Sequence, residues 1–315
     1  MTAPDRVSDR AADRAYAFLV NPLSGGGAAP EAVVPVARLL RDAGARVEVT
    51  YTAGPQATVD LIDAAVGRGE VVVAVGGDGM LSSVAGRVAE AGGTLGVVPA
   101  GRGNDFARML GLPHEPADVA RVLLDGTPRP IDLVSLQLPG AAGPRVVAGS
   151  VYCGVDARAG EIVDRVRWMP GRVQYPYAAL HSLATYRPVA LRLEVDGTAY
   201  DFRAATVVVA NSGYYGSGMR IAPDARVDDG LLDVVVIEAA SRRELIRALP
   251  KVYDGGHVAL PEVHVLRGRS VRVSGTPAVP IGGDGEPLGH LPASPDAPAR
   301  IDVLPAALPV LHPPS

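Results

Sequence analysis

Residues 71–79 have the sequence Val-Val-Val-Ala-Val-Gly-Gly-Asp-Gly, an apolar run that ends in three glycines around one carboxylate. The run lacks polar alternation, which favours a strand buried on both faces, as in a parallel sheet covered by helices. The glycines allow turns that other residues resist, and they let backbone N–H groups approach an anion. Apolar residues recur at helical spacing over 81–89, so we expect a helix whose N-terminus points at the same place. The stretch predicts a nucleotide phosphate site.

Asp78 is the only charged residue in this stretch. A carboxylate in a phosphate pocket repels its ligand unless a cation lies between them, so Asp78 implies Mg²⁺. A glycine-rich turn with an N-capping aspartate is the alternative interpretation. The motif alone leaves this alternative open, because glycine motifs produce many false positives.

Length and composition narrow the class of protein. The chain has 315 residues, enough for two domains, and its 48% hydrophobic and 20% charged residues indicate a globular protein. Thirty basic and 34 acidic residues give a net charge of −4 without a block of like charges, which argues against nucleic acid as a partner. A single cysteine, Cys153, and an N-terminus without the apolar core of a signal peptide favour a cytoplasmic protein. No apolar run is long enough to span a bilayer, so any membrane contact is expected to be peripheral.

The first 130 residues alternate between predicted strands and helices. Strands are expected at 15–20, 45–52, 70–75 and 94–99, and helices at 33–40 and 57–66. This alternation implies a Rossmann-like α/β domain with a parallel sheet, right-handed crossovers and ligands beyond the carboxyl ends of the strands. Glycine-rich loops at 21–27, 76–79 and 99–108 follow the first, third and fourth strands, so all three should converge at one edge.

From about Pro130 the pattern changes to strands and hairpins with fewer helices. Asp196-Gly197 between two alternating runs predicts a type I′ hairpin, and helices are expected at 157–167, 176–186 and 241–253. We interpret residues 14–130 as the nucleotide domain and residues 131–303 as an antiparallel β-sandwich domain. The proline-rich end, 304–315, is expected to be loose or to pack back on the first domain.

Two loops in the second half carry suggestive carboxylates. The turn at Asp228-Asp229-Gly230 has donors for a hard cation, although an ordinary Asp-Gly turn fits equally well. In Asp284-Gly285-Glu286 two carboxylates flank a glycine, and a kinase needs such groups to accept a hydroxyl proton and to organise metal-bound water. A hairpin tip with two exposed acids is the alternative for this second loop.

These motifs together resemble the diacylglycerol kinase catalytic family, which also includes sphingosine and ceramide kinases. The resemblance rests on Asn21-Pro22-x-Ser24-Gly25, the loop 76–79, the run Gly101-x-Gly103-Asn104-Asp105-Phe106-Ala107-Arg108, the turn at 228–231 and the acids at 284–286, in that order. It covers roughly residues 16–304. It implies phosphorylation of a lipid hydroxyl by ATP, with the active site between an α/β domain and a β-sandwich.

The resemblance also implies roles for individual residues. Nucleotide contacts are expected from loop residues that follow the strands of the first domain: Asn21, Pro22, Ser24, Gly25, Thr52, Gly76, Gly77, Asp78, Gly79, Met80, Ser83, Gly101, Arg102, Gly103, Asn104 and Asp105. A structural Mg²⁺ site is expected at the carbonyls of Arg226 and Leu231 and the side chain of Asp229. Glu286 matches the proton acceptor with Asp284 beside it, and Asp132 matches a further acidic position.

The chain departs from the family pattern just after the first motif. Met80 stands where the family has threonine, and Ser82-Ser83 stand where it has Asn-Glu. Arg102 occupies the threonine position of the later loop and adds a planar cation suited to bidentate phosphate binding.

We therefore expect a lipid kinase that uses ATP and Mg²⁺ and works in the cytoplasm, peripherally at the inner membrane surface. Diacylglycerol is the expected acceptor, but the sequence does not separate it from a sphingoid base, ceramide or another bacterial lipid. The alternatives are an enzyme resembling NAD kinase, which also uses a Gly-Gly-Asp-Gly loop, and a catalytically degenerate protein that binds nucleotide or lipid. Whether the chain forms a homodimer is left open.

Overall fold

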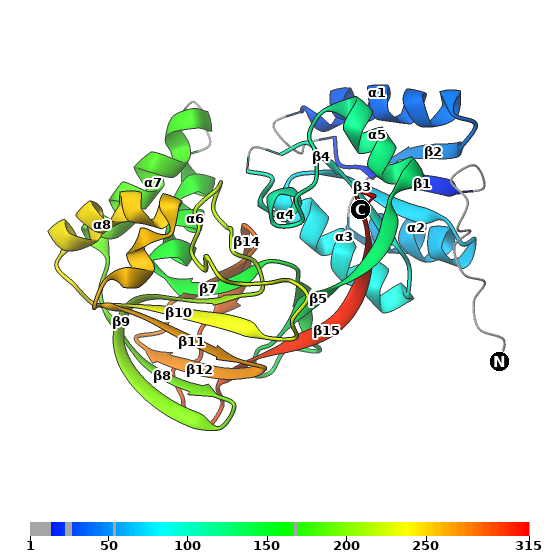
Figure 1. Ribbon diagram of the computed structural model, residues 1–315. Coiled ribbons are helices and arrows are strands. Elements are labelled where there is room, and N and C mark those ends of the chain that lie inside the picture. Colours follow the sequence, from blue (N-terminus) through cyan, green and yellow to red (C-terminus); the bar gives the residue numbers. More distant parts are fainter. Residues whose placement is uncertain are drawn as a thin grey trace. The chain divides into compact units, whose positions relative to one another are not determined.

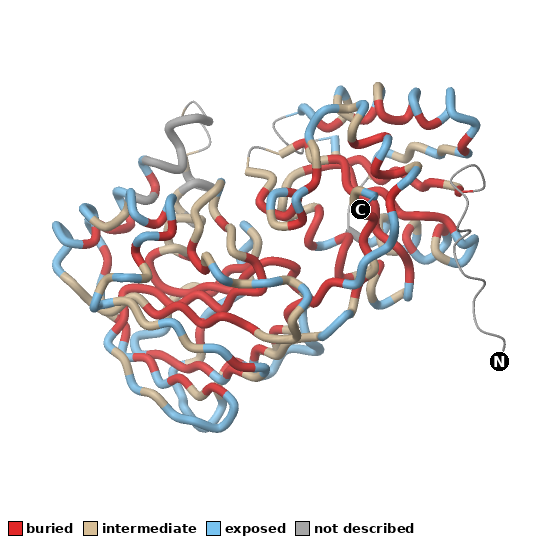
Figure 2. The backbone as a smooth tube through the Cα atoms, viewed as in Figure 1, coloured by how far each residue is buried: buried red, intermediate tan, exposed pale blue. Residues whose placement is uncertain are grey.

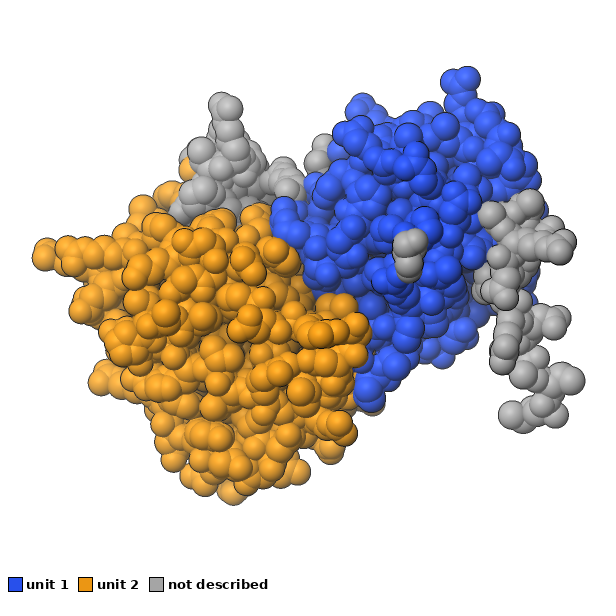
Figure 3. Space-filling view, in the orientation of Figure 1, with its two compact units in different colours: residues 1–133, 305–315 blue, residues 134–304 orange. Residues whose placement is uncertain are grey.

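The computed structural model describes residues 14–22, 27–52, 55–101, 103–166, 169 and 171–314. The chain divides into two compact units (Figure 1, Figure 3). Unit 1 comprises residues 1–133 and 305–315, and unit 2 comprises residues 134–304. Buried residues form the interior of each unit, and exposed residues line the outer faces of its helices (Figure 2).

Unit 1 is an α/β domain built on a parallel sheet, as the sequence predicts. The strands lie in the order β2-β1-β3-β4, and each neighbouring pair is parallel. Helices α1 and α5 pack together on one face, and α2 and α3 pack together on the other (Figure 1). The element bounds are β1 Ala15–Val20, α1 Ala29–Asp42, β2 Arg46–Tyr51, α2 Pro55–Gly67, β3 Val71–Gly76, α3 Asp78–Ala91, β4 Leu95–Pro99, α4 Asp105–Met109 and α5 Pro116–Asp125.

The strand order creates a topological switch between β1 and β3. The chain leaves β1 toward β2 on one side and later returns to β3 on the other side of β1. Loops that follow such neighbouring strands diverge, which leaves a crevice beyond the carboxyl ends where ligands bind in this fold class. All six residues of β3 are buried, which agrees with the run of apolar residues at 71–75.

The proline-rich end of the chain forms part of a strand. β15 (Ala299–His312) begins in unit 2 and ends in unit 1, where Val310 pairs in parallel with Leu95. Leu308, Val310 and Leu311 are buried there. Their apolar side chains, rather than the prolines between them, decide the conformation, so residues 304–312 are not a loose tail.

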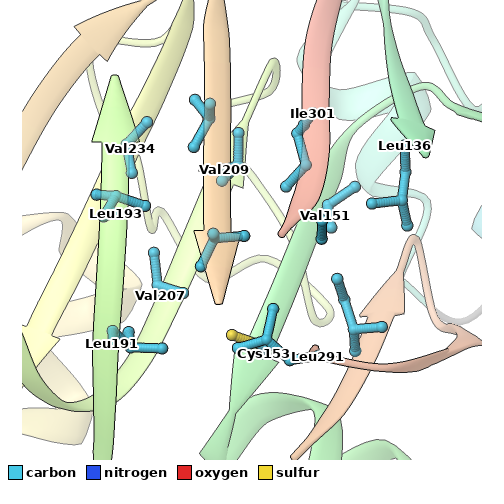
Figure 4. Packing of buried hydrophobic residues seen from close by; sticks show 14 of the residues in the cluster. Leu136, Val151, Cys153, Leu191, Leu193, Val207, Val209, Val234, Leu291 and Ile301 are labelled. Carbon is cyan, nitrogen blue, oxygen red and sulfur yellow. The ribbon is translucent and has the colours of Figure 1, made fainter. Parts of the chain in front are cut away.

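Unit 2 is an antiparallel β-sandwich. β5 (Thr127–Gln137) enters it from unit 1, and its other strands before β15 are β6 Arg145–Val147, β7 Ser150–Gly154, β8 Val189–Val195, β9 Thr198–Ala210, β10 Leu232–Glu238, β11 Val263–Gly268, β12 Ser270–Thr276, β13 Pro280–Gly283 and β14 Glu286–His290. Val207 and Val209 of β9 point into the main core with Val151 and Val234 (Figure 4). The strand alternates, so Val208 contributes to a second cluster on the opposite face.

Three helices cover that opposite face of the sheet formed by β7, β9 and β10. They are α6 (Val155–Arg165), α7 (Gly171–Thr185) and α8 (Arg242–Asp254). Ala157 of α6 and Val252 of α8 join the cluster that contains Val208, and Leu183 of α7 packs with Leu245 of α8. The helices therefore form a layer on the sandwich.

Cys153 lies in the main core of the sandwich and is 3% exposed. Burial raises the pKa of its thiol to about 12. Because the thiolate is the reactive form of cysteine, this residue acts as a small apolar side chain, as the sequence predicts.

Candidate active site

Most of the residues predicted to contact the nucleotide, where the structure describes them, follow the carboxyl ends of the four parallel strands of unit 1. Asn21 and Pro22 follow β1, Thr52 follows β2, residues 76–80 end β3 and begin α3, and residues 101 and 103–105 follow β4. Ser24, Gly25 and Arg102 lie outside the described residues. Because the strands are parallel, these positions lie at one edge of the sheet.

The loops after β3 and β4 pack directly against each other through two glycines. A Cβ atom on Gly101 would lie 2.4 Å from the Cα of Gly77, a distance that no side chain tolerates. The backbone N–H of Ala100 donates to the carbonyl of Gly76 at 2.9 Å, and the N–H of Gly101 donates to Oδ1 of Asn104 at 2.7 Å. The glycines at these two positions are therefore required for backbone packing.

Asp78 joins the same two loops. It is the first residue of α3, and its Oδ1 accepts the backbone N–H of Phe106 at 2.9 Å. A carboxylate at a helix N-terminus is favoured by the helix dipole. Asp78 thus fixes the loop after β4 to the start of α3, and it is half-buried.

Three further residues that are predicted to contact the nucleotide have defined roles or bonds within unit 1. Asn104 adopts φ = 52° as the N-cap of α4, and the buried Asp105 forms an ion pair with Arg108. The N–H and hydroxyl of Thr52 both donate to the carbonyl of Val20, at 2.9 and 3.4 Å. These bonds shape the loops. Direct contact of the three residues with a nucleotide stays a prediction.

Two positions after the motif differ in exposure. Met80 is half-buried in the first turn of α3, and Ser83 is exposed one turn later. Their contact with a nucleotide also stays a prediction.

The carboxylate at the carboxyl edge of the unit 1 sheet suits a Mg²⁺ ion that is bound together with a nucleotide. Magnesium is commonly held by one or two carboxylates together with phosphate oxygens and water, and Asp78 supplies such a carboxylate. Within the side chains that the structure describes, no group of three or more His, Cys, Asp and Glu residues is placed to hold a metal ion.

In unit 2, Asp284 is bonded to the backbone of a distant segment. Its Oδ2 accepts the N–H groups of Ala148 and Gly149 at 3.0 and 2.8 Å, and its Oδ1 accepts the N–H of Ser150 at 2.8 Å. Asp284 and Gly285 have φ values of 45° and 87° at the tip of the β13–β14 hairpin, which is the geometry of a type I′ turn.

The hairpin between β8 and β9 repeats this arrangement at a site with no predicted catalytic role. Asp196 and Gly197 have φ values of 46° and 84°, which confirms the type I′ turn expected from the sequence. The carboxylate of Asp196 accepts the backbone N–H groups of Arg269 and Ser270 at 2.9–3.1 Å. The comparison indicates that the carboxylate of Asp284 positions its hairpin, and its predicted catalytic role stays a prediction.

Glu286 differs from Asp284 in exposure and in place. It is exposed at the start of β14, opposite Gly283 of β13. The hydroxyl of Tyr152 accepts the N–H of Gly285 at 3.1 Å, so Tyr152 also holds the hairpin tip just before Glu286. Of the two acids, Glu286 therefore has the exposure that a proton acceptor needs.

In the turn that is predicted to hold a structural Mg²⁺, Asp229 forms an ion pair with Arg267. Asp229 Oδ1 accepts the N–H of Leu231 at 3.0 Å, and Oδ2 lies 2.5 Å from the Arg267 guanidinium. Arg267 also pairs with the buried Asp233 at 3.2 Å. Burial raises the pKa of Asp233, while Arg267 opposes that shift. Both oxygens of Asp229 thus have partners, and a cation at this turn would compete with the Arg267 guanidinium for Oδ2.

The remaining roles at this turn are not tested by these contacts. Arg226 pairs through its side chain with Asp228 at 3.2 Å, and the metal roles of Arg226, Asp229 and Leu231 stay predictions.

Asp132 is buried in unit 1 and accepts the N–H of Ala306 at 2.7 Å, so it fixes the returning end of the chain.

Sequence reasoning missed Tyr152 and Arg267. Neither lies in a recognisable motif, and each acts on a residue more than 30 positions away, Gly285 and Asp229 respectively. The only signal was the Asp-Gly turn itself, which indicates a carboxylate available to neighbouring backbone but not which backbone it meets.

Comparison with known proteins identifies the family. Residues 15–136 match the family described as the diacylglycerol kinase catalytic domain, and residues 149–312 match the YegS C-terminal NAD kinase beta sandwich-like domain. A protein named diacylglycerol kinase from Mycobacterium tuberculosis (strain ATCC 25618 / H37Rv) is 37% identical over 301 residues, which cover 94% of each chain. This chain belongs to the diacylglycerol kinase family. It is accordingly a lipid kinase, and thus a transferase.

More distant members of the diacylglycerol kinase family agree. A protein of that name from Bacillus subtilis (strain 168) is 27% identical, covering 87% of this chain and 90% of its own. The crystal structure of a diacylglycerol kinase from Bacillus anthracis str. Sterne has a TM-score of 0.68 at 18% identity, covering 96% of this chain and 97% of that one. At this identity the structural likeness supports the fold alone.

None of the helices in the described part of the chain has the length and apolarity needed to cross a membrane.

Proposed function

We propose that this enzyme transfers the γ-phosphate of ATP to a hydroxyl of diacylglycerol or a closely related lipid. The observation that carries the proposal is the assembly of the loops after β3 and β4 through Gly77, Gly101 and Asp78 at the carboxyl edge of the sheet. Such an edge presents backbone N–H groups and a helix N-terminus to an anion.

Unit 1 would hold the nucleotide. The N–H groups of the loops after β1, β3 and β4 would bind the phosphates, and Arg102 would add a cation in place of the family threonine. When bound, Mg²⁺ would neutralise charge that develops on the phosphates. Asp78 would hold that ion directly or through water.

Unit 2 would supply the base. Glu286 would accept the proton of the lipid hydroxyl as that oxygen attacks the γ-phosphorus in line and the bond to the β-phosphate oxygen breaks. Asp284 would keep the hairpin in place through its three N–H partners. Catalysis would then consist mostly of positioning and charge stabilisation.

Diacylglycerol is the favoured acceptor because the related proteins that match this chain carry that name. A sphingoid base, ceramide or another bacterial lipid presents a similar hydroxyl. We place the reaction at the inner surface of the membrane, where cytoplasmic ATP meets a lipid acceptor. Formation of a homodimer is a further open prediction.

A second candidate follows from the match of the sandwich to a domain described as NAD kinase beta sandwich-like. An NAD kinase would phosphorylate a soluble dinucleotide rather than a lipid. The two functions therefore differ in an acceptor that can be supplied separately.

The test is a screen with ATP labelled at its γ-phosphate. The enzyme is incubated with a total bacterial lipid extract, with diacylglycerol in mixed micelles and with NAD, and labelled products are identified by mass. We expect phosphatidic acid, with product formation at least 100-fold slower for Asp78→Ala and Glu286→Ala. Formation of NADP alone would reassign the enzyme, and ATP binding without any labelled product would indicate a degenerate protein.

A further inference from the structure

The outer face of α8 differs from an ordinary solvated helix surface. Its exposed side includes two large apolar side chains, Ile246 at 37% and Tyr253 at 53% exposure. They are seven residues apart, and Leu249 between them is half-buried because it packs against the cluster that contains Leu245. At this spacing the three residues follow one another along one side of the helix. The result is an apolar stripe beside the buried face that Leu245 and Val252 form.

A row of cations lies next to that stripe. Arg243, Arg247 and Lys251 are spaced four residues apart, and all three are exposed. Arg242 adds a fourth basic residue to the helix. The only acidic residues in α8 are Glu244 and Asp254, and each accepts a backbone N–H at its end of the helix, from Ser241 and Gly256 respectively.

This concentration of positive charge contrasts with the chain as a whole. The chain carries a net charge of −4, whereas α8 has four basic residues and two acidic ones. Lys251 is the only lysine in the sequence. A cationic, partly apolar helix on an otherwise acidic protein suits an anionic partner that also accepts apolar side chains.

The neighbouring helix α7 also carries exposed apolar side chains. Tyr177 and Leu180 of α7 are 42% and 50% exposed. Helix α7 packs against both α8 and α6, and α6 in turn contacts β13 and β14. The same helical layer therefore joins α8 to the hairpin that carries Glu286.

We propose that α8 docks this enzyme on the surface of an anionic lipid bilayer. Ile246 and Tyr253 would insert among the lipid headgroups, while Arg243, Arg247 and Lys251 would contact the phosphates. This inference rests on the proposed function in that a membrane lipid is the acceptor. It goes further by naming the surface that binds the membrane and the charge of the lipids it requires.

A second copy of the chain is the competing occupant of this face. A two-fold interface centred on α8 would bring the row Arg243, Arg247 and Lys251 against its own copy, and like charges would oppose that contact. Anionic lipids instead complement both the charge and the apolar stripe. The surface therefore favours a bilayer over self-association.

Vesicle binding tests the proposal without reference to activity. Sedimentation is measured with vesicles of phosphatidylcholine alone and with vesicles containing about 30% phosphatidylglycerol. We expect binding only to the second kind, weakened by salt. Arg243→Glu/Arg247→Glu should weaken it at least tenfold, and so should Ile246→Ser/Tyr253→Ser.

A matched control is Arg192→Glu/Arg272→Glu, which reverses two exposed arginines on the sandwich strands β8 and β12. This control should keep at least half of the wild-type vesicle affinity, and melting temperatures verify that each variant is folded. Acylation of Lys251, read by peptide mass, should slow severalfold when phosphatidylglycerol vesicles are added.

The proposal is overturned if the wild-type protein does not bind these vesicles, or if the control variant loses as much affinity as the α8 variants. It is also overturned if light scattering shows a dimer that the α8 variants dissociate. Phosphorylation of a soluble short-chain diacylglycerol separates the two ideas. Activity there without vesicle binding would reject the docking surface alone, and vesicle binding without activity on any lipid would reject the proposed function alone.

Discussion

The two candidate site regions are built by different means. In unit 1 the loops after β3 and β4 meet through bare backbone at Gly77 and Gly101, with Asp78 bridging to the next loop. In unit 2 the tip at Asp284 is held by side-chain bonds to segments far away in the sequence. The backbone contact at Gly77 and Gly101 leaves no room for an added atom. At the hairpin, the loss of stability from a substitution should instead scale with the number of hydrogen bonds that it removes.

This difference has a consequence for what each region does. Strand order places the unit 1 loops at one edge of the sheet, where we propose that their N–H groups bind the phosphates of the nucleotide. The unit 2 hairpin depends on one carboxylate and one phenol hydroxyl to place the exposed Glu286. Substitutions in the first region should thus act on nucleotide binding, and substitutions in the second on the rate of transfer.

Gly101→Ala should have the largest effect. The new methyl group would meet the Cα of Gly77 at 2.4 Å, and backbone cannot move aside as a side chain would. We expect at least a 100-fold loss of transfer, with a loss of about 1–3 kcal/mol in the free energy of unfolding. Kinase assays and denaturant melts measure these effects.

Gly67→Ala is the control for that change, because a Cβ at Gly67 meets nothing within 4 Å and its φ is ordinary. It should leave both quantities close to wild type. Full activity in Gly101→Ala would show that the two loops do not need their close packing.

Asp284→Ala should have the second largest effect. It removes the acceptor of three backbone N–H groups, which costs about 3 kcal/mol in the free energy of unfolding and slows transfer at least tenfold. Asp196→Ala breaks equivalent bonds at the other type I′ turn, so it should lower stability by a similar amount without slowing transfer. Equal losses of transfer in both variants would remove the functional distinction between the hairpins.

His257 provides a pH test of unit 2. Burial lowers the pKa of its imidazole, and its Nε2 lies 3.0 Å from the carbonyl of Ile221. Because the folded pKa lies below the usual value of about 6.5, the free energy of unfolding should fall as the pH drops below that value. The slope attributable to this group is at most about 1.4 kcal/mol per pH unit.

His257→Gln should flatten that part of the profile between about pH 7.5 and 5.5. Hydrogen exchange resolves the location, and we expect faster exchange in peptides around residues 221 and 257 and unchanged exchange in β3. A profile as steep as that of the wild type would exclude His257 as the cause.

Met80→Thr should have the smallest effect. It restores the hydroxyl of the family motif in the first turn of α3, where Met80 is half-buried. A new phosphate hydrogen bond should raise kcat/KM for ATP by a few-fold, in line with about 1 kcal/mol. Lower activity would indicate that Arg102 and the methionine already work together.

The sequence predicted the regions that depend on local pattern. The buried run at 71–75, the glycines that follow it and the turn at Asp196-Gly197 each form as expected, because strand burial and turn geometry are encoded within a few residues. The parallel sheet followed from the spacing of strands and helices.

The contacts that could not be predicted from the sequence join residues that are far apart along the chain. Asp284 meets residues 148–150 more than 130 positions earlier, and Asp229 meets Arg267, so the Asp-Gly letters alone did not indicate these bonds. The catalytic role of Asp284 and the metal role of Asp229 stay predictions. For the proline-rich end the sequence left two alternatives open, a loose end or packing against the first domain, and burial of Leu308 and Val310 in β15 favours the second.

We propose that unit 1 binds the nucleotide and that Glu286 of unit 2 accepts the proton. It is tested most directly by measuring ATP affinity and single-turnover transfer to diacylglycerol in Glu286→Gln. We expect wild-type ATP affinity with transfer slowed at least 100-fold. Transfer at the wild-type rate, or loss of ATP binding in this variant, would contradict it.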